Sequence, residues 1–434
     1  MTIDVVIADD SAFLRKNIAD ILKSHELINL IEFAENGEEA IHQIKLHNPD
    51  VLVLDLVMPK MNGLDAFKVI MEDHPTPTVI LSAINPKDLN SSIQALLMGA
   101  FDYIIKPGGI GAKDLPRFRE ELLAKVLLAS QSQIKRIFRN HNINKRKGLT
   151  IRQDIVDEIF DFGRYLNKIQ PIQEEEEQEA HIIEIRKTEP REKKVFEQIS
   201  KDEESSQAKS FKLKINSKAN NLKSAKKPLN FSLKKSFQFQ NAIKETSFTP
   251  NLTLIKEFLL EPTIIVIGAS VGGPRTITTI LRDIPRNFPA PILIVQHLSS
   301  HFTEAFADNL DLECNIKIKV AADGDLLKPG VGYIAPGEKH MEVSIQNEKY
   351  CVKVYKGTPI NFCMPSIDVL FSSAAKVYRN RTIGVLLTGM GSDGVNGLNS
   401  IQKVCGKTIA ESEETCILYA MPKFAAEKGF ADFI

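Results

Sequence analysis

Short apolar runs alternate with amphipathic segments in two parts of the chain, residues 1–128 and 256–434. In the first part, the strand-sized runs are Val5–Ala8, Leu30–Phe33, Val51–Leu54, Val79–Leu81 and Tyr103–Ile105. In the second part, they are Ile264–Ile267, Ile292–Val295, Ile383–Leu387 and Thr408–Ala410. Apolar strands that alternate with helices are typical of a parallel sheet with helices on both faces. The pattern therefore predicts two α/β domains, each built on a doubly wound parallel sheet.

The stretch His340–Val354 departs from this alternation. Two short runs, Met341–Ile345 and Tyr350–Val354, flank the polar turn Gln346–Lys349. Two runs joined by a short polar turn are typical of an antiparallel hairpin. We therefore expect a β-hairpin within the second domain.

Residues 129–255 differ from both domains in composition. They contain blocks of like charge, and no acidic residue occurs between Ser205 and Lys244. Low hydrophobicity combined with like-charge blocks favours a long, largely disordered linker. Apolar residues at spacings of three and four nevertheless predict one helix in the linker, near residues 150–170.

Overall charge and composition exclude several classes of protein. The 434 residues include 55 lysines and arginines and 55 aspartates and glutamates, so the formal net charge is zero and indicates no nucleic-acid partner. No apolar run approaches the roughly 18 residues that span a bilayer, and the N-terminus lacks the features of a signal peptide. The five cysteines include no C-x-x-C pair, which fits reduced thiols. We expect a cytoplasmic protein.

Charged and hydroxyl side chains follow most of the predicted strands of the first domain. Their positions, in chain order, are Asp9, Asp10, Asp55, Ser82 and Lys106. Functional groups of an open parallel sheet gather beyond the carboxyl ends of its strands, so these side chains should converge. Clustered carboxylates repel one another unless a cation joins them, and Mg²⁺ prefers such oxygen ligands. Asp55 can then accept a phosphoryl group while the metal and Lys106 neutralise the developing charge.

Over residues 1–128, which include the run Asp55–Gly63, the sequence resembles a response-regulator receiver domain with a flavodoxin-like fold. The resemblance implies that Asp55 is the phosphoacceptor. The residues that it assigns to Mg²⁺ binding are Asp9, Asp10, Asp55 and Val57, the last through its backbone carbonyl. The residues that it assigns to the phosphate-responsive switch are Ser82 and Tyr103, with Lys106 beside them.

The glycine-rich turn Gly268–Gly273 follows the first predicted strand of the second domain. It fits either a phosphate or dinucleotide cradle at a helix N-terminus, or a turn that presents Ser270 as a nucleophile. A dinucleotide site needs an acidic residue at the end of the next strand, but that strand ends in Gln296 and His297. Asp393 follows a third strand, and serine, histidine and aspartate can act as nucleophile, base and orienting group. Their order along the chain differs from that of α/β-hydrolases, which argues against that fold.

These features resemble the catalytic domain of the chemotaxis protein-glutamate methylesterase family, whose members are also called protein-glutamine deamidases. The similar runs are Gln296–His297, Ala321–Asp325, Ala335–Gly337, Pro365–Phe371, Thr388–Gly394 and Tyr419–Pro422. The resemblance implies a Rossmann-like domain in which Ser270 is the nucleophile, His297 the base and Asp393 its partner. It places the oxyanion site near the backbone of Met390, and Val271 stands where the family usually has threonine.

The resemblance implies a phosphorylation-activated hydrolase for adaptation in bacterial chemotaxis. Its substrates would be glutamate methyl esters and glutamines of methyl-accepting chemoreceptors. The protein would be peripheral to the membrane, and only through its binding to these receptors. A chemotaxis histidine kinase would donate the phosphoryl group, Mg²⁺ would serve phosphorylation, and ester hydrolysis would need no cofactor. Two alternatives stay open. One is a non-catalytic phospho-switch with a degenerate C-terminal domain that binds receptors, and the other is nucleic-acid binding through the lysines of Ser205–Lys244.

Overall fold

The structure is a computed structural model that describes residues 2–83, 85–107, 115–138 and 263–434. The expected helix near residues 150–170 and most of the expected linker, 129–255, lie outside the described residues. The described residues form two folded domains.

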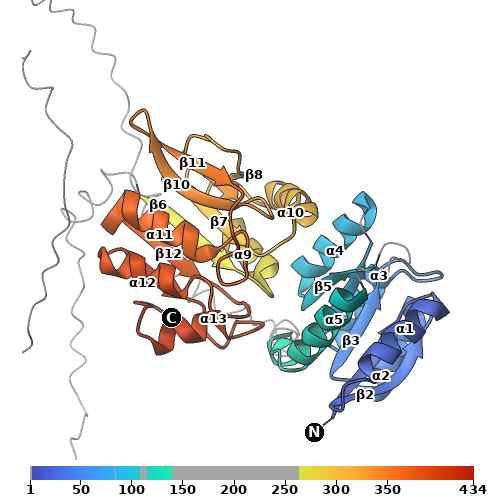
Figure 1. Cartoon of the computed structure of the whole chain (residues 1–434). Coiled ribbons are helices and arrows are strands. Elements are labelled where there is room, and N and C mark those ends of the chain that lie inside the picture. The colour runs from blue at the N-terminus through green and yellow to red at the C-terminus, as the bar shows by residue number, and fades with distance from the viewer. Residues whose placement is uncertain (1, 84, 108–114, 139–262) are drawn as a thin grey trace, which may run out of the picture. The chain divides into compact units, whose positions relative to one another are not determined.

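The first domain contains a five-stranded parallel sheet in the order β2-β1-β3-β4-β5 (Figure 1). Its strands are β1 (Ile3–Ala8), β2 (Ile28–Ala34), β3 (Val51–Asp55), β4 (Thr78–Ser82) and β5 (Asp102–Ile105). Its helices are α1 (Ala12–Leu22), α2 (Gly37–His47), α3 (Gly63–Asp73), α4 (Pro86–Met98) and α5 (Leu115–Ser130). The order and parallel pairing confirm the predicted doubly wound sheet.

Burial and helix capping explain this local structure. Every residue of the central strands β3 and β4 is buried, as expected for strands covered on both faces. Serine or asparagine begins each of the first four helices, where the side chain accepts a hydrogen bond from a first-turn N–H. These capping residues are Ser11, Asn36, Asn62 and Asn85. Because all the strands are parallel, the loops that lead from strand ends to helix starts lie together at the carboxyl edge of the sheet.

The second domain contains a six-stranded parallel sheet in the order β13-β12-β6-β7-β9-β8, and a separate two-stranded hairpin. The sheet strands are β6 (Ile264–Ala269), β7 (Ile292–Gln296), β8 (Lys317–Val320), β9 (Val331–Ile334), β12 (Thr382–Leu386) and β13 (Lys407–Ala410). The helices are α9 (Gly273–Arg282), α10 (Ser300–Glu313), α11 (Ile367–Tyr378), η1 (Arg379–Arg381), α12 (Val395–Lys403) and α13 (Met421–Glu427). This sheet confirms the second α/β domain.

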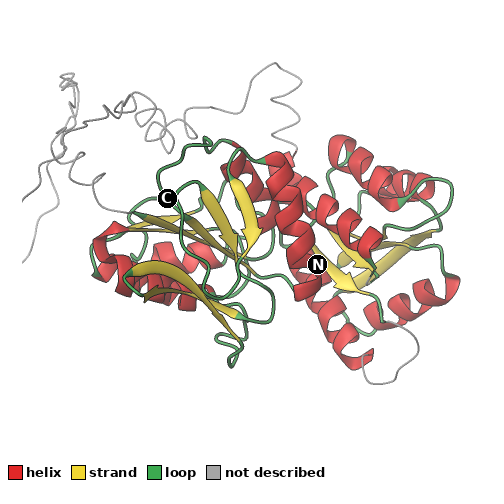
Figure 2. Cartoon of the chain, turned by 90° about the horizontal axis from the view of Figure 1, so that it is seen from above, coloured by secondary structure: helices red, strands yellow, loops and turns green. Residues whose placement is uncertain are grey.

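Helices cover both faces of this sheet (Figure 2). Alternate residues of β6 enter two different cores: Ile264 and Val266 pack in the core that includes α11 and α12, whereas Ile267 packs in the core that includes α9 and α10. Successive side chains of a strand point to opposite faces, so a strand buried on both faces must be apolar throughout. This requirement explains the apolar runs seen in the sequence.

The predicted hairpin is present as β10 (His340–Gln346) and β11 (Lys349–Tyr355), which pair antiparallel. Asn347 and Glu348 form its turn with φ angles of 48° and 63°. Positive φ at both central residues is the geometry of the two-residue turns that match strand twist. The hairpin packs on α11, where the Val343 N–H donates to Ser373 Oγ at 2.9 Å.

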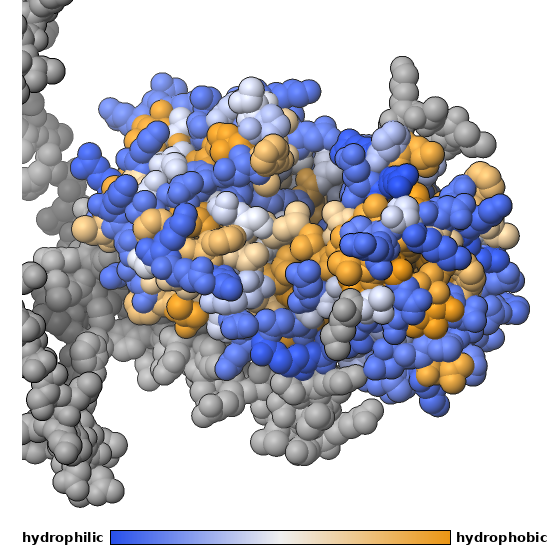
Figure 3. Space-filling view, turned by 60° about the horizontal axis from the view of Figure 1, so that its bottom comes forward, coloured by the Kyte–Doolittle hydropathy of each residue, from blue (hydrophilic) through white to orange (hydrophobic). Residues whose placement is uncertain are grey.

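No helix in the described ranges is both long and apolar enough to cross a membrane. The face drawn in Figure 3 interleaves hydrophilic and hydrophobic residues.

Candidate functional site

Three carboxylates gather at the carboxyl edge of the first sheet. Asp9 and Asp10 follow β1, and Asp55 is the last residue of β3. Their ligand atoms all lie within 4.8 Å of one another. Lys106, which follows β5, places its Nζ 3.1 Å from Asp9 Oδ2 and 2.7 Å from Asp55 Oδ2. The structure thus brings together the four charged residues selected from their positions at strand ends.

Burial and charge act together in this cluster. Asp9 and Asp55 are buried, whereas Asp10 is exposed. Burial raises the pKa of the Asp55 carboxyl, the Lys106 ammonium partly lowers it, and the Asp9 charge raises it again. Burial lowers the pKa of Lys106, but Asp55 and Asp9 outweigh this effect and leave it above its usual value. Three carboxylates beside one ammonium carry excess negative charge, so these oxygen donors fit a hard divalent cation such as Mg²⁺.

Of the other residues expected around Asp55, Val57 and Ser82 lie at the same edge and Tyr103 lies within the neighbouring strand. The Val57 N–H donates to Asp55 Oδ1 at 3.2 Å. Ser82 is the buried last residue of β4, and Tyr103 lies on the neighbouring strand β5. Metal binding by the Val57 carbonyl and the switch roles of Ser82 and Tyr103 stay predictions.

In the second domain, Ser270 follows β6 on a turn whose backbone is tied to neighbouring segments. Its N–H donates to the Thr388 carbonyl at 3.0 Å, and its carbonyl accepts from Gln296 Nε2 at 2.8 Å. The Val271 carbonyl accepts from Thr388 Oγ1 at 2.9 Å. These bonds fix the serine turn against the end of β7 and against the segment that follows β12.

Two glycines allow this packing. Gly272 has a φ of 79°, and a Cβ there would lie 2.6 Å from Ile417 Cβ. A Cβ on Gly389 would lie 2.6 Å from Ser270 Cβ. Because real Cβ atoms do not approach other atoms so closely, larger residues at either position would displace the turn.

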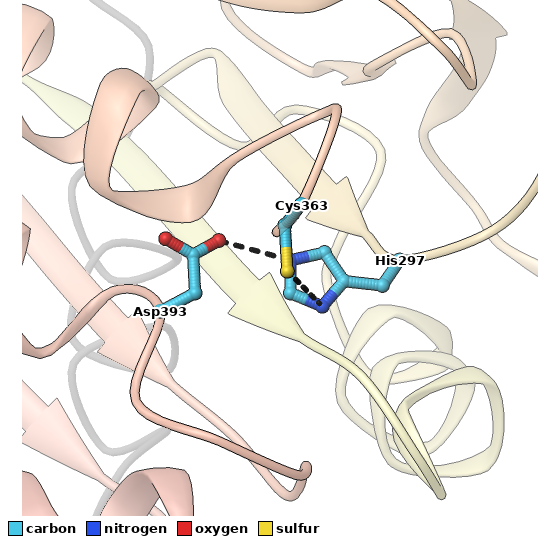
Figure 4. A group of neighbouring side chains, drawn as sticks. All are labelled: His297, Cys363 and Asp393. Carbon is cyan, nitrogen blue, oxygen red and sulfur yellow. Dashed lines mark hydrogen bonds and ion pairs between the residues drawn. The ribbon is translucent and has the colours of Figure 1, made fainter. Parts of the chain in front are cut away.

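His297 and Asp393 form a direct pair. His297 follows β7, and its backbone N–H donates to the Ala269 carbonyl at 3.1 Å. Its Nε2 lies 3.0 Å from Asp393 Oδ2 (Figure 4). Because β12, β6 and β7 are neighbours in the sheet, Asp393, Ser270 and His297 come from the ends of three adjacent strands.

Asp393 is held by more than the histidine. The N–H of Ile367 donates to its Oδ2 at 2.7 Å, and Ser366 Oγ donates to its Oδ1 at 2.8 Å. Asn361 Nδ2 donates to Oδ1 at 3.1 Å. Burial would raise the pKa of Asp393, but the hydrogen bond and charge of His297 and the Ile367 N–H lower it below its usual value. The carboxylate therefore stays ionised beside the imidazole.

The other ring nitrogen of His297 faces a residue that sequence reasoning missed. Its Nδ1 lies 3.7 Å from Cys363 Sγ (Figure 4). Burial lowers the pKa of His297, but the hydrogen bonds and charges of Asp393 and Cys363 outweigh this and raise it to about 9. The only signal for Cys363 in the sequence is its position just before the run Pro365–Phe371. Among the described residues, no hydrogen bond joins Ser270 Oγ to His297, so the structure pairs His297 with Asp393 but leaves the serine hydroxyl unpaired.

Two backbone N–H groups near Ser270 are free of protein partners in the described part of the chain. They belong to Val271, directly after the serine, and to Met390, directly after Gly389. Met390 is about half exposed. Unpaired N–H groups beside a nucleophile can stabilise an oxyanion.

Comparisons with known proteins agree with this architecture. Residues 265–434 match the family model described as CheB methylesterase, and residues 5–113 match that of the response regulator receiver domain. A protein-glutamate methylesterase/protein-glutamine glutaminase of Thermotoga maritima is 30% identical over 432 residues, covering 100% of this chain and 94% of its own. One from Geobacillus kaustophilus is 31% identical over 434 residues, covering 100% of this chain and 95% of its own.

Among solved structures, the crystal structure of the Thermotoga maritima CheB methylesterase catalytic domain is 43% identical. It covers 40% of this chain and 92% of its own, with a TM-score of 0.39. In this chain, the receiver match precedes the methylesterase match. This chain therefore belongs to the family of protein-glutamate methylesterases/protein-glutamine glutaminases.

Proposed function

We propose that the protein hydrolyses glutamate methyl esters, and deamidates glutamines, on methyl-accepting chemoreceptors under the control of receiver phosphorylation. The observation that carries this proposal is the pair formed by the half-buried His297 and the buried Asp393 beside the Ser270 turn. Possession of all three groups favours an enzyme over a degenerate receptor-binding domain.

The reaction we propose is acyl transfer through Ser270. Its Oγ attacks the ester carbonyl carbon while His297 takes the hydroxyl proton. Because Nε2 is engaged by Asp393, Nδ1 is the nitrogen that accepts this proton. The ionised Asp393 stabilises the imidazolium. Catalytic hydrogen bonds are often absent until substrate binds, so the unpaired Ser270 hydroxyl is compatible with this role.

The leaving group decides between the two activities. His297 returns the proton to the departing oxygen, methanol leaves, and water then attacks the acyl-enzyme to free the glutamate. With glutamine, ammonia leaves in place of methanol. The N–H groups of Val271 and Met390 would stabilise the oxyanion of each tetrahedral intermediate.

Control is assigned to Asp55, which would take the phosphoryl group from a chemotaxis histidine kinase. Asp9, Asp10 and Asp55 would hold Mg²⁺, which supplies counter-charge for the phosphate oxygens. Lys106, already paired with Asp55, would contact the added phosphoryl group, and Ser82 and Tyr103 would respond to it.

Methanol release from methylated receptors tests the hydrolase. Wild type should release methanol, and Ser270→Ala should reduce the rate by about 10⁶-fold, the order seen when a catalytic serine is lost. Ser400→Ala is a matched control, because Ser400 is half-buried on α12 and its hydroxyl, within the described residues, donates to the Asn396 carbonyl alone. Near-normal turnover in Ser270→Ala would exclude the serine mechanism. A wild-type protein that binds receptors without releasing methanol would instead support the non-catalytic phospho-switch.

A further inference from the structure

The catalytic histidine is flanked by a thiol that the proposed acyl transfer does not use. Cys363 lies in the segment before α11, and its side chain is half-buried. Its Sγ lies 3.7 Å from His297 Nδ1 and 3.3 Å from the Asn361 carbonyl oxygen. One ligand atom each of His297, Cys363 and Asp393 lie within 4.8 Å of one another.

The distance between sulfur and nitrogen matches two ligands of one tetrahedral zinc ion. Zinc binds thiolate sulfur at about 2.3 Å and imidazole nitrogen at about 2.1 Å, and at a tetrahedral angle these bonds place the two atoms about 3.6 Å apart. Cys363 Sγ and His297 Nδ1 are 3.7 Å apart. A zinc ion could therefore bind both atoms with little movement of the Cys363 or His297 side chain.

Asp393 completes the arrangement from the far side of the ring. A histidine that binds zinc through one nitrogen usually donates its other N–H to a carboxylate, which orients the ring and makes it a better ligand. Asp393 Oδ2 occupies this position at 3.0 Å from Nε2. The contacts with Ser366 and Ile367 hold the carboxylate there.

We propose that Cys363 and His297 form an inhibitory Zn²⁺ site. The Cys363 S–H bond and the His297 Nδ1–H bond break as the S–Zn and N–Zn bonds form, and both protons go to solvent. His297 binds through neutral Nδ1 and keeps its Nε2–H on Asp393, and two water molecules fill the remaining positions. Because Nδ1 is also the atom that takes the Ser270 proton, zinc and hydrolysis exclude each other. The inhibition rests on the proposed function, whereas metal binding does not.

Cobalt absorption tests binding without reference to activity. Full-length, chelator-treated protein is titrated with Co²⁺ in excess Mg²⁺, so that the carboxylates of the receiver are occupied. Wild type should develop a near-ultraviolet thiolate-to-cobalt band that saturates at one equivalent, and Zn²⁺ should abolish it. Cys363→Ser and Cys363→Ala should lack the band. Cys405→Ser is the matched control, because Cys405 is an exposed thiol of the same domain, and it should keep the band.

Two further variants separate the metal ligands from their support. His297→Ala should remove the band, whereas Asp393→Asn should retain it with 10- to 100-fold weaker binding, the usual effect of losing a carboxylate behind a metal-bound histidine. Wild type without the band, or a Cys363→Ser variant that keeps it, would overturn the proposal. Circular dichroism melts show whether each variant is folded, and the pair of Cys363 substitutions guards against one of them unfolding.

The activity arm measures zinc inhibition of methanol release, each variant relative to its own metal-free rate. The half-inhibitory Zn²⁺ concentration should rise at least 10-fold in Cys363→Ser and stay unchanged in Cys405→Ser. Equal inhibition of wild type and Cys363→Ser would overturn the inhibitory role. If wild type shows the cobalt band but releases no methanol at any zinc concentration, the proposed hydrolase fails while the metal site stands.

Discussion

Replacing Asp393 with asparagine should move the pH at which the protein becomes active. The substitution removes the negative charge that lies 3.0 Å from His297 Nε2. Burial lowers the pKa of His297, but other effects outweigh it and raise this pKa from 6.5 to about 9. The hydrogen bond to Asp393 is the largest of the raising effects. One pKa unit corresponds to about 1.4 kcal/mol, so the surroundings favour the imidazolium by about 3 kcal/mol.

This shift has a definite sign in the pH profile. His297 must be neutral to take the Ser270 proton, so wild-type kcat/KM should rise with pH and level off above about 9. In Asp393→Asn, burial still lowers the pKa of His297 and Cys363 still raises it, but the carboxylate no longer does, so the inflection should move to lower pH. The plateau should fall by about 10⁴-fold, because the imidazolium of the transition state loses its counter-charge.

The assay is methanol release measured across a pH range that brackets both values. Asp311→Asn is a control, because Asp311 pairs with Lys317 on the surface of the same domain. It should leave the inflection in place. Thermal melts check folding, since asparagine offers a single carbonyl oxygen where Asp393 accepts at two. An inflection that stays at about 9 in Asp393→Asn would refute the assignment of the raised pKa to this pair.

Three further experiments test other parts of the molecule. Acetyl phosphate with Mg²⁺ should label wild type but not Asp55→Asn, and a chelator should block labelling; a labelled Asp55→Asn would place the phosphosite elsewhere. Gly394→Ala should lower the free energy of unfolding in urea by about 2–4 kcal/mol, because the φ of Gly394 is 90° and a Cβ there would lie 2.6 Å from Leu386 Cδ1. Gly391→Ala should lower it by only about 1–2 kcal/mol, the cost of backbone strain, because the φ of Gly391 is 84° and the space around it is open. The fragment 256–434 should hydrolyse esters faster than unphosphorylated full-length protein, and equal rates would show that the receiver does not restrain the catalytic domain.

The strands that carry functional residues could be predicted from the sequence because they are buried on both faces. Such strands are apolar throughout, and the rule for strand ends then groups Asp9, Asp55 and Lys106, or Ser270 and His297. Strands β8 and β9 were not predicted from the sequence. The outer strand β8 alternates lysine with apolar residues, and β9 has only four residues, one of which is Gly332.

The details of the catalytic centre could not be predicted for a different reason. Which nitrogen of His297 meets Asp393 depends on the ring orientation, and that is set by tertiary contacts from distant segments. Cys363 reaches the ring from a loop that belongs to no strand of the sheet. Strand-end reasoning covers residues placed by the sheet, and it has no means of finding a side chain that a loop contributes.

The hydrogen bond from the Ile367 amide to Asp393 has a consequence for measuring the enzyme. This amide opens the first turn of α11, and its acceptor is the same oxygen that contacts His297. Exchange of its hydrogen with deuterium requires the hydrogen bond to the Asp393 carboxylate to open transiently. The exchange rate at this single position therefore reports how often Asp393 leaves the Ile367 amide that holds it, without substrate and without a mutation. A ligand that locks the pair should slow exchange at Ile367 more than at amides elsewhere on the helix.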